Sequence, residues 1–154
     1  MKALELMTRN VHRCSKDDSL EQAARVMWES DVGCLVVTNA EDHPVGMITD
    51  RDIAMAAYTQ GAPLRNARVE SAMSREVKSC ATNASVSEVE GVMRSSQIRR
   101  VPIVEAGGKL AGIVTLGDIA RSSQASALRA GEIPGVAKTL AAVTEPRSLA
   151  TAAE

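Results

Sequence analysis

Two short segments of this 154-residue chain carry side chains suited to binding a nucleotide. Gly46-Met-Ile-Thr49-Asp-Arg-Asp52 and Gly112-Ile-Val-Thr115-Leu-Gly-Asp118 share the spacing Gly-x-x-Thr-x-x-Asp. Each threonine stands where a strand is expected to become a helix, and the first turn of a helix offers free N–H groups and a positive dipole end to a phosphate. A carboxylate three residues later can accept hydrogen bonds from the two hydroxyls of a ribose.

The same spacing also suits a capping box, which only starts a helix. One copy of the motif therefore does not separate the two interpretations. Because it occurs twice, at equivalent positions and after a glycine-led strand, the nucleotide interpretation is favoured.

The two segments belong to an internal repeat. When the chain is aligned with itself at an offset of 66 residues, residues 7–54 match residues 73–120 without a gap, and fourteen of these 48 pairs are identical. A repeat of about 48 residues is marginal as a free-standing domain, so the pair is the expected folding unit. We predict that the two copies pack about a pseudo-two-fold axis and leave two related clefts between them.

Hydrophobic patterning predicts the same order of elements in both repeats. In repeat 1, Ser19 and Gln22 form a capping box at the start of a helix that ends near Ser30; strands over 34–38 and 45–49 and a helix over 50–60 follow. In repeat 2, Ser85 and Glu88 cap a helix, and strands over 101–104 and 110–115 precede a helix from Leu116 to about residue 131. The expected divisions are repeat 1 over 1–60, a linker over 61–71, repeat 2 over 72–131, and a mobile or weakly helical tail over 132–154.

Composition excludes several classes of protein. A net charge of -1 argues against a general nucleic-acid or membrane binder. No stretch approaches 18 apolar residues, so neither a membrane span nor a signal peptide is indicated. Three cysteines, an odd number, suggest the reducing cytoplasm. His12 and His43 have no cysteine or carboxylate at ligand spacing, so we expect no metal site.

The pattern as a whole resembles the cystathionine-β-synthase (CBS) domain, in a tandem pair also called a Bateman module. The resemblance rests on Met7-Thr-x-x-Val11 and Met73-Ser-x-x-Val77, the capped helices, the segments 32–37 and 98–104, and the two Gly-x-x-Thr-x-x-Asp endings. It implies an α+β fold of two β-α-β-β-α repeats packed through their sheets. It also implies binding of an adenosine-containing ligand (AMP, ADP, ATP or S-adenosylmethionine), regulation in place of catalysis, and a dimer of pairs.

The resemblance assigns residues to each cleft: a carboxylate for ribose, a threonine for ribose or phosphate, apolar side chains and backbone groups around adenine, and a hydroxyl or cation near phosphate. Cleft 1 is predicted to contain Thr8, Val11, His12, Val32, Met47, Thr49, Arg51, Asp52, Arg99 and Arg100. Cleft 2 is predicted to contain Ser74, Val77, Lys78, Ile98, Ile113, Thr115 and Asp118.

Basic residues distinguish the two predicted clefts. The family often meets phosphate with cations from the strand of the other repeat; here that strand carries Arg99 and Arg100, opposite Gly33 and Cys34 in repeat 1. Arg51 precedes Asp52, whereas a glycine precedes Asp118. We therefore expect phosphate to bind more tightly in cleft 1, although Arg99 and Arg100 could also be a solvated surface pair.

Two functions remain in competition at this stage. The first is a non-enzymatic regulatory module that senses an adenine nucleotide or related adenosyl ligand and transmits this to a separate partner protein. The second is an interaction protein of the same fold whose clefts are vestigial. Because the helices after Thr49 and Thr115 are apolar beyond the needs of one inner face, a homodimer is expected in both cases.

Overall fold

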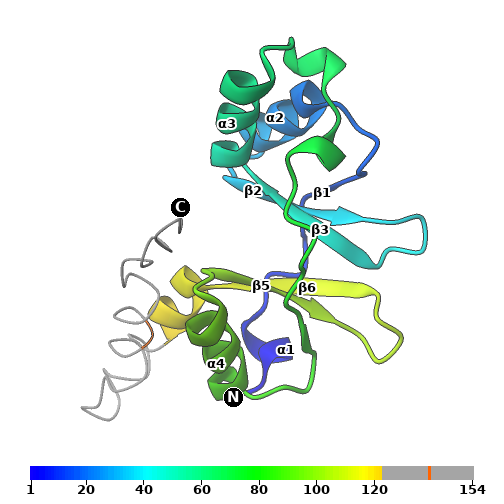
Figure 1. Ribbon diagram of the computed structural model, residues 1–154. Helices are drawn as coiled ribbons and strands as arrows, with labels where there is room; N and C mark the ends of the chain where they lie inside the picture. Colours follow the sequence, from blue (N-terminus) through cyan, green and yellow to red (C-terminus); the bar gives the residue numbers. More distant parts are fainter. Residues whose placement is uncertain (123–138, 140–154) are drawn as a thin grey trace, which may run out of the picture.

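The computed structural model describes residues 1–122 and Thr139. Within these residues the chain forms two three-stranded sheets that face each other across the middle of the molecule, with helices on the outer sides (Figure 1). This α+β arrangement of two repeats confirms the predicted fold class.

Repeat 1 forms one sheet in the order β1 (Arg13–Cys14), β2 (Cys34–Thr38) and β3 (Pro44–Thr49). β1 is parallel to β2, and β2 is antiparallel to β3. Two helices, α2 (Leu20–Glu29) and α3 (Asp50–Gln60), pack against this sheet through a shared apolar core.

Repeat 2 has the same topology, with β4 (Cys80–Ala81), β5 (Arg100–Val104) and β6 (Leu110–Thr115). The helix α4 (Val86–Ser96) packs against this sheet, and a second helix begins at Leu116 and is described as far as Ser122. The rest of that predicted helix and the predicted tail over 132–154 lie outside the described residues, apart from Thr139.

Short-range capping explains where the helices begin. The Ser19 hydroxyl accepts a hydrogen bond from the Gln22 N–H at 3.1 Å, while the Gln22 side chain accepts one from the Ser19 N–H at 2.8 Å. Ser85 and Glu88 form the same reciprocal pair at the start of α4. These interactions satisfy N–H groups that would otherwise lack a partner, and both predicted capping boxes are confirmed.

The two repeats exchange their leading segments. The short helix α1 (Ala3–Leu6) lies beside α4 (Figure 1), and Ala3 and Met7 are buried in the core of repeat 2. Conversely, the segment before repeat 2 forms the 3-10 helices η1 (Leu64–Asn66) and η2 (Val69–Ser71), and the fully buried Val69 joins the core of repeat 1. The segment predicted as a linker is thus a packed part of repeat 1.

Paired backbone hydrogen bonds fasten each exchanged segment to the edge of the other sheet. Thr8 and Ile113 exchange two N–H···O bonds of 2.9 and 3.0 Å, and Ser74 and Met47 do the same at 2.9 and 3.0 Å. The close approach requires a glycine, because a Cβ at Gly112 would lie 2.5 Å from the Met7 sulfur and 2.9 Å from the Thr8 carbonyl oxygen. A glycine in this strand therefore admits another backbone.

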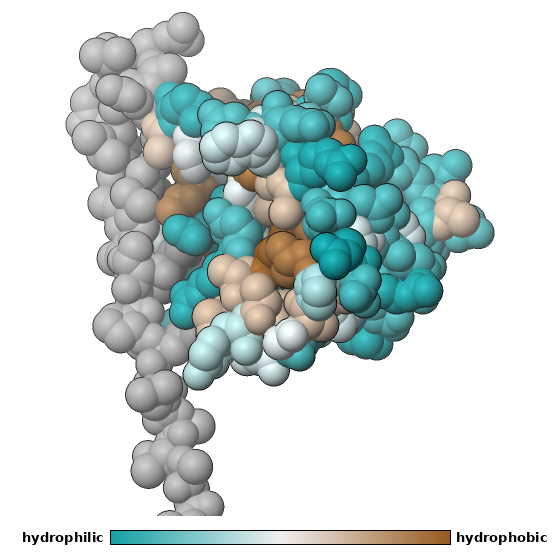
Figure 2. Space-filling view, turned by 90° about the horizontal axis from the view of Figure 1, so that it is seen from above, coloured by the Kyte–Doolittle hydropathy of each residue, from teal (hydrophilic) through white to brown (hydrophobic). Residues whose placement is uncertain are grey.

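A third apolar cluster joins the sheets to each other. It consists of Val11, Val36 and Leu110, with Met47 and Ile113 packed against it. The outer surface is different in character: Figure 2, which views the molecule from above Figure 1, shows mostly hydrophilic residues with smaller hydrophobic patches between them.

Candidate functional site

A cleft of about 420 Å³ opens between the two repeats. Repeat 1 supplies the segment 8–12 and the turn that leads into β2, and repeat 2 supplies residues of β5, β6 and the helix after β6. We call it the Asp118 cleft. Its lining residues are Thr8, Asn10, Val11, His12, Asp31, Val32, Gly33, Cys34, Val36, Arg100, Ile113, Thr115, Asp118 and Arg121.

Thr115 and Asp118 hold each other at one end of this cleft. The Asp118 Oδ2 accepts hydrogen bonds from the Thr115 hydroxyl at 2.7 Å and from the Thr115 N–H at 2.8 Å, and the Asp118 N–H donates to the Thr115 hydroxyl oxygen at 3.2 Å. Asp118 is only 8% exposed. The motif is therefore a true capping box, and it also fixes a nearly buried carboxylate at the wall of a cleft.

Arg121 engages the other oxygen of this carboxylate. Its Nη2 forms an ion pair and hydrogen bond with the Asp118 Oδ1, one helical turn away. The guanidinium passes over Gly117, where a Cβ would lie 3.2 Å from the Arg121 Nη1. The sequence reasoning missed Arg121, although the repeat offers a signal: its counterpart at the 66-residue offset is Met55.

Arg100 brings a second cation into the cleft from β5. Its backbone lies opposite Thr115 in the β5–β6 ladder, and its guanidinium reaches toward repeat 1, where the Nη2 lies 3.7 Å from the position of a Cβ on Gly33. The Asp50 carboxylate lies 3.2 Å from the same position. A side chain at residue 33 would therefore compete with both charged groups for this space.

Cys34 lines the cleft next to Arg100. Burial raises the pKa of the Cys34 thiol and nearby Asp50 adds to the increase, while the positive charge of Arg100 opposes it. Burial raises the pKa of Cys14 further, to about 12, with Asp18 contributing. Both thiols are consequently protonated near neutral pH and are poor nucleophiles, so they behave as small hydrophobic residues.

Four aliphatic side chains form an apolar part of the cleft wall. Val11 and Val36 are buried, and Val32 and Ile113 are half-buried. The cleft thus combines apolar side chains, a fixed carboxylate and two arginines. A flat heterocycle that carries a sugar and an anionic group matches this combination of groups.

The structure groups the predicted site residues differently from the sequence prediction. Five residues predicted for cleft 1 line the Asp118 cleft: Thr8, Val11, His12, Val32 and Arg100. They lie there with Ile113, Thr115 and Asp118, which were predicted for cleft 2. The correction has a backbone cause, because Thr8 pairs with β6 of repeat 2 and carries its neighbours to that sheet.

The other members of the predicted sets belong to the pseudo-symmetric side. There Ser74 pairs with Met47, and Thr49 and Asp52 repeat the capping geometry, with Oγ1···Oδ2 at 2.7 Å and N···Oδ2 at 2.8 Å. Lys78 forms an ion pair with Glu76.

The other four predicted residues are Arg51 in the first turn of α3, Val77 in the segment before β4, and Ile98 and Arg99 just before β5. Arg51 and Arg99 are exposed, and the Arg99 carbonyl accepts a hydrogen bond from the Leu116 N–H at 2.9 Å. Val77 is half-buried, and Ile98 packs against the core of repeat 2.

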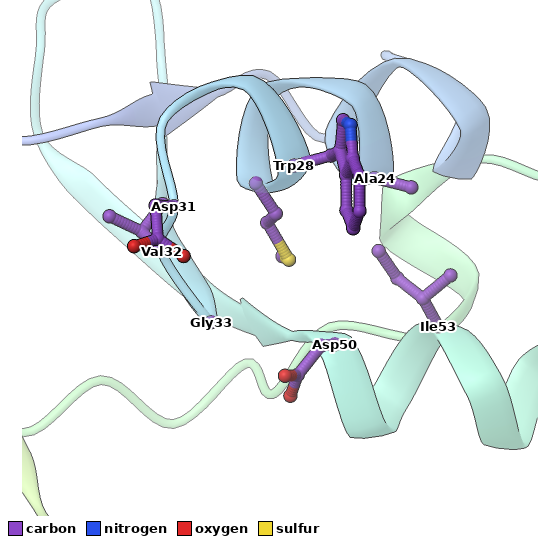
Figure 3. Close-up of a pocket in the computed structure, with 8 residues that line it drawn as sticks. Ala24, Trp28, Asp31, Val32, Gly33, Asp50 and Ile53 are labelled. Atoms are coloured by element: carbon purple, nitrogen blue, oxygen red, sulfur yellow. The ribbon is translucent and has the colours of Figure 1, made fainter.

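A second hollow, of about 350 Å³, adjoins the Asp118 cleft on the helical side of repeat 1 (Figure 3). The residues Asp31, Val32 and Gly33 line both spaces, so this turn is a shared wall. In Figure 3, Trp28 projects from α2 beside the hollow, and Ile53 and Asp50 of α3 lie across it. Trp28 is 88% exposed.

The described residues contain no group of three or more His, Cys, Asp or Glu side chains placed to hold a metal ion. Among the same residues, no helix is both long and apolar enough to cross a bilayer.

Comparison with known proteins agrees with this architecture. The family model described as "CBS domain" matches residues 3–58 and 69–125. The chain belongs to the CBS-domain family. The first match begins with the first residue of α1, and the second begins with the first residue of η2.

The similarity to one relative of known structure extends over both CBS repeats. Hypoxic response protein 1 of Mycobacterium tuberculosis is 34% identical over 77% of this chain and 82% of its own length. A crystal structure of Hypoxic Response Protein I with two coordinated zinc ions has a TM-score of 0.72, with 79% of this chain and 98% of that chain covered.

Two structures with bound adenosyl compounds share the fold at lower identity. The CBS domain pair of protein MJ0100, in complex with 5-methylthioadenosine and S-adenosyl-L-methionine, is 24% identical, with a TM-score of 0.73 over 82% of this chain and 98% of that chain. CBSX2 in complex with AMP is 23% identical, with a TM-score of 0.71 over 81% of this chain and 97% of that chain.

Proposed function

We propose that this CBS pair is a non-enzymatic regulatory module that binds an adenosyl ligand in the Asp118 cleft. The observation that carries the proposal is the convergence of Thr115, Asp118, Arg100 and Arg121 with an apolar wall in one cleft of about 420 Å³. Pockets of roughly 300–1,000 Å³ with apolar walls and a few polar groups are typical small-molecule sites. Ligands of CBS pairs with the same fold, AMP and S-adenosyl-L-methionine among them, support the ligand class.

Each part of the ligand has a suitable partner in the cleft. The base fits against Val11, Val32 and Ile113, and the ribose hydroxyls can donate to the fixed Asp118 carboxylate. Phosphate oxygens accept from the guanidinium groups of Arg100 and Arg121, because charge-assisted hydrogen bonds to arginine are stronger than neutral ones. Burial of a phosphate without such partners costs several kcal/mol, on the order of a lost buried charge pair.

The shared wall suggests how occupancy of the cleft is transmitted. A ligand in the Asp118 cleft contacts the turn of Asp31, Val32 and Gly33, which also lines the hollow beside Trp28. A change in this turn therefore alters the surface on the helical side of repeat 1. We propose that this surface meets a partner: a second copy of the chain in a homodimer, or a separate target protein in the cytoplasm.

The competing function is an interaction protein with vestigial clefts. The exposed Trp28, Tyr58 and Met55 on the helices of repeat 1 would serve that role without any ligand. The two arginines in the Asp118 cleft favour the ligand-binding function, because an empty cleft has no need for two cations.

A thermal-unfolding screen separates the two functions. The purified chain is heated with AMP, ADP, ATP, adenosine or S-adenosylmethionine, each at increasing concentration. A ligand at 100 times its Kd stabilises the fold by about 2.7 kcal/mol, which raises the unfolding temperature measurably. A rise with at least one of these ligands supports the sensor, whereas no rise with any of them at millimolar concentration supports the interaction protein.

A further inference from the structure

The two oxygens of the Asp118 carboxylate have different partners. Oδ2 already accepts two hydrogen bonds, both from Thr115. A carboxylate oxygen has two lone pairs, so this oxygen has no capacity left for a ligand. Oδ1 is therefore the atom that a sugar hydroxyl can use, and Arg121 is bound to it in the ligand-free chain.

The position of Arg121 depends on the residue at 117. Because Gly117 has no side chain, the guanidinium can lie across the first turn of the helix and reach Asp118. A Cβ at residue 117 would be 3.2 Å from the Arg121 Nη1, which is closer than ordinary van der Waals contact, so the arginine would have to move.

Repeat 1 lacks both parts of this arrangement. At the equivalent positions it has Arg51 where repeat 2 has Gly117, and Met55 where repeat 2 has Arg121. The Thr49–Asp52 pair has the same internal hydrogen bonds as Thr115–Asp118. The capping of the carboxylate by an arginine is thus specific to the Asp118 cleft.

We propose that Arg121 makes the Asp118 cleft select adenosyl ligands that carry a phosphate over those that do not. This inference rests on the proposed function. Any ligand whose ribose binds the Oδ1 of Asp118 has to displace or share Arg121. A nucleotide offers the released guanidinium a phosphate in exchange for the carboxylate, whereas a nucleoside offers no replacement and loses the ion pair without compensation.

The exposure of Arg121 allows this exchange. Its side chain is 72% exposed, while that of Asp118 is 10% exposed. An ion pair with one solvated partner is weak, so a phosphate can compete for the guanidinium. The long arginine side chain can turn from the carboxylate to the ligand while its helix stays in place.

Calorimetric titration of AMP and adenosine into three variants tests the proposal. In Arg121→Ala, we expect AMP to bind at least tenfold more weakly and adenosine to bind as well as before or more tightly. In Gly117→Ala, the arginine is kept but must shift by a few tenths of an ångström, which weakens its contact with the carboxylate, so adenosine should bind slightly more tightly while AMP loses less than it does in Arg121→Ala. Met55→Ala, the matched substitution in repeat 1, should leave both affinities unchanged.

Several results would overturn the proposal. If Arg121→Ala weakens AMP and adenosine by the same factor, the arginine only supports the fold of the site, and if it changes neither, the arginine does not meet the ligand. In both cases the proposed function stands, because the wild-type chain still binds. If the wild-type chain binds neither compound, nor any other adenosyl ligand in the thermal screen, the proposed function and the role of Arg121 fail together.

Discussion

The Thr115–Asp118 side and the Thr49–Asp52 side of this CBS pair share their backbone framework and differ in their charges. Both have a capping box with a 2.7 Å hydroxyl-to-carboxylate hydrogen bond, and on both an exchanged segment is fastened to the glycine-led strand. The Asp118 cleft has Arg100 and Arg121. The equivalent residues of repeat 1 are Cys34, which itself lines the Asp118 cleft, and Met55.

This difference separates what the fold supplies from what individual residues add. The repeat supplies a fixed threonine and carboxylate twice, because both residues are needed to start a helix. Cations are not needed for folding, so they can differ between the sides: Arg100 and Arg121 line the Asp118 cleft, whereas Arg51 and Lys78 belong to the other side. We therefore expect the arginines to determine which side binds a phosphate, and the carboxylate to determine where the ribose binds.

The largest effect is expected when the two sides are made alike. In the double variant Arg100→Cys, Arg121→Met, the Asp118 cleft receives the residues of its counterpart. Each lost charge-assisted hydrogen bond costs roughly 1.5–3 kcal/mol, so AMP should bind more than a hundredfold more weakly by calorimetry. A loss of less than tenfold would show that these arginines do not bind the phosphate.

Substitution of Trp28 should weaken the dimer, whereas substitution of its counterpart in repeat 2 should not. Its counterpart Arg94 donates a hydrogen bond to the Oγ1 of the fully buried Thr139 at 3.3 Å, so the chain itself covers that position in repeat 2. Trp28, by contrast, is exposed beside an apolar hollow. We expect Trp28→Arg to shift the sedimentation mass from dimer toward monomer, and Arg94→Ala to leave the dimer intact. A monomeric wild-type chain at micromolar concentration, or a dimer unaffected by Trp28→Arg, would contradict this.

Substitution of Gly112 and of Gly46 by alanine should destabilise the fold to a similar extent. A Cβ at Gly112 would meet the Met7 sulfur at 2.5 Å, and one at Gly46 would meet the Met73 sulfur at 2.8 Å. Because backbone oxygens lie 2.9 Å away in both cases, neither site can relax freely. Gly112→Ala and Gly46→Ala should each lower the free energy of unfolding by about 1–3 kcal/mol in chemical denaturation. A large difference between them would show that the exchanged segments are not fastened equivalently.

The smallest effect concerns the thiol in the cleft. Burial raises the pKa of Cys34 above its ordinary value, so the reactive thiolate is scarce at pH 7 and increases as the pH rises toward the raised pKa. Alkylation of Cys34, followed by mass spectrometry, should therefore be slow at neutral pH and faster at pH 9. Saturating AMP should slow it severalfold, because the ligand covers this wall of the cleft. Cys14 should stay unmodified in both cases, and equal rates with and without AMP would place the ligand elsewhere.

Sequence patterns predicted the parts of the fold that depend on neighbouring residues. Ser19 with Gln22, Ser85 with Glu88, and the helix after Thr49 are determined within one helical turn, and the structure confirms them. The repeat likewise identified Thr115 and Asp118 as a pair. Their role in ligand binding stays a prediction.

These sequence patterns could not predict the exchange of segments between the repeats. Thr8 pairs with Ile113, more than a hundred residues later, and a repeat cannot indicate which of two similar sheets a short segment joins. This ambiguity placed Thr8, Val11 and His12 with Asp52 in the sequence prediction, in place of Asp118. Arg121 was missed for a simpler reason, since the aligned repeat ends at Ala120 and the difference from Met55 lies one residue beyond it.

The central claim is that the adenosyl ligand binds at Asp118 and not at Asp52. Asp118→Ala and Asp52→Ala remove the same capping interactions, so they should cost similar stability, about 0.5–2 kcal/mol each. The most direct measurement is calorimetric titration of AMP into both variants and the wild type. We expect Asp118→Ala to weaken AMP binding at least tenfold and Asp52→Ala to keep it within about threefold, because a charge-assisted hydrogen bond is lost at one site only. If AMP binding is lost in Asp52→Ala and kept in Asp118→Ala, the claim is contradicted.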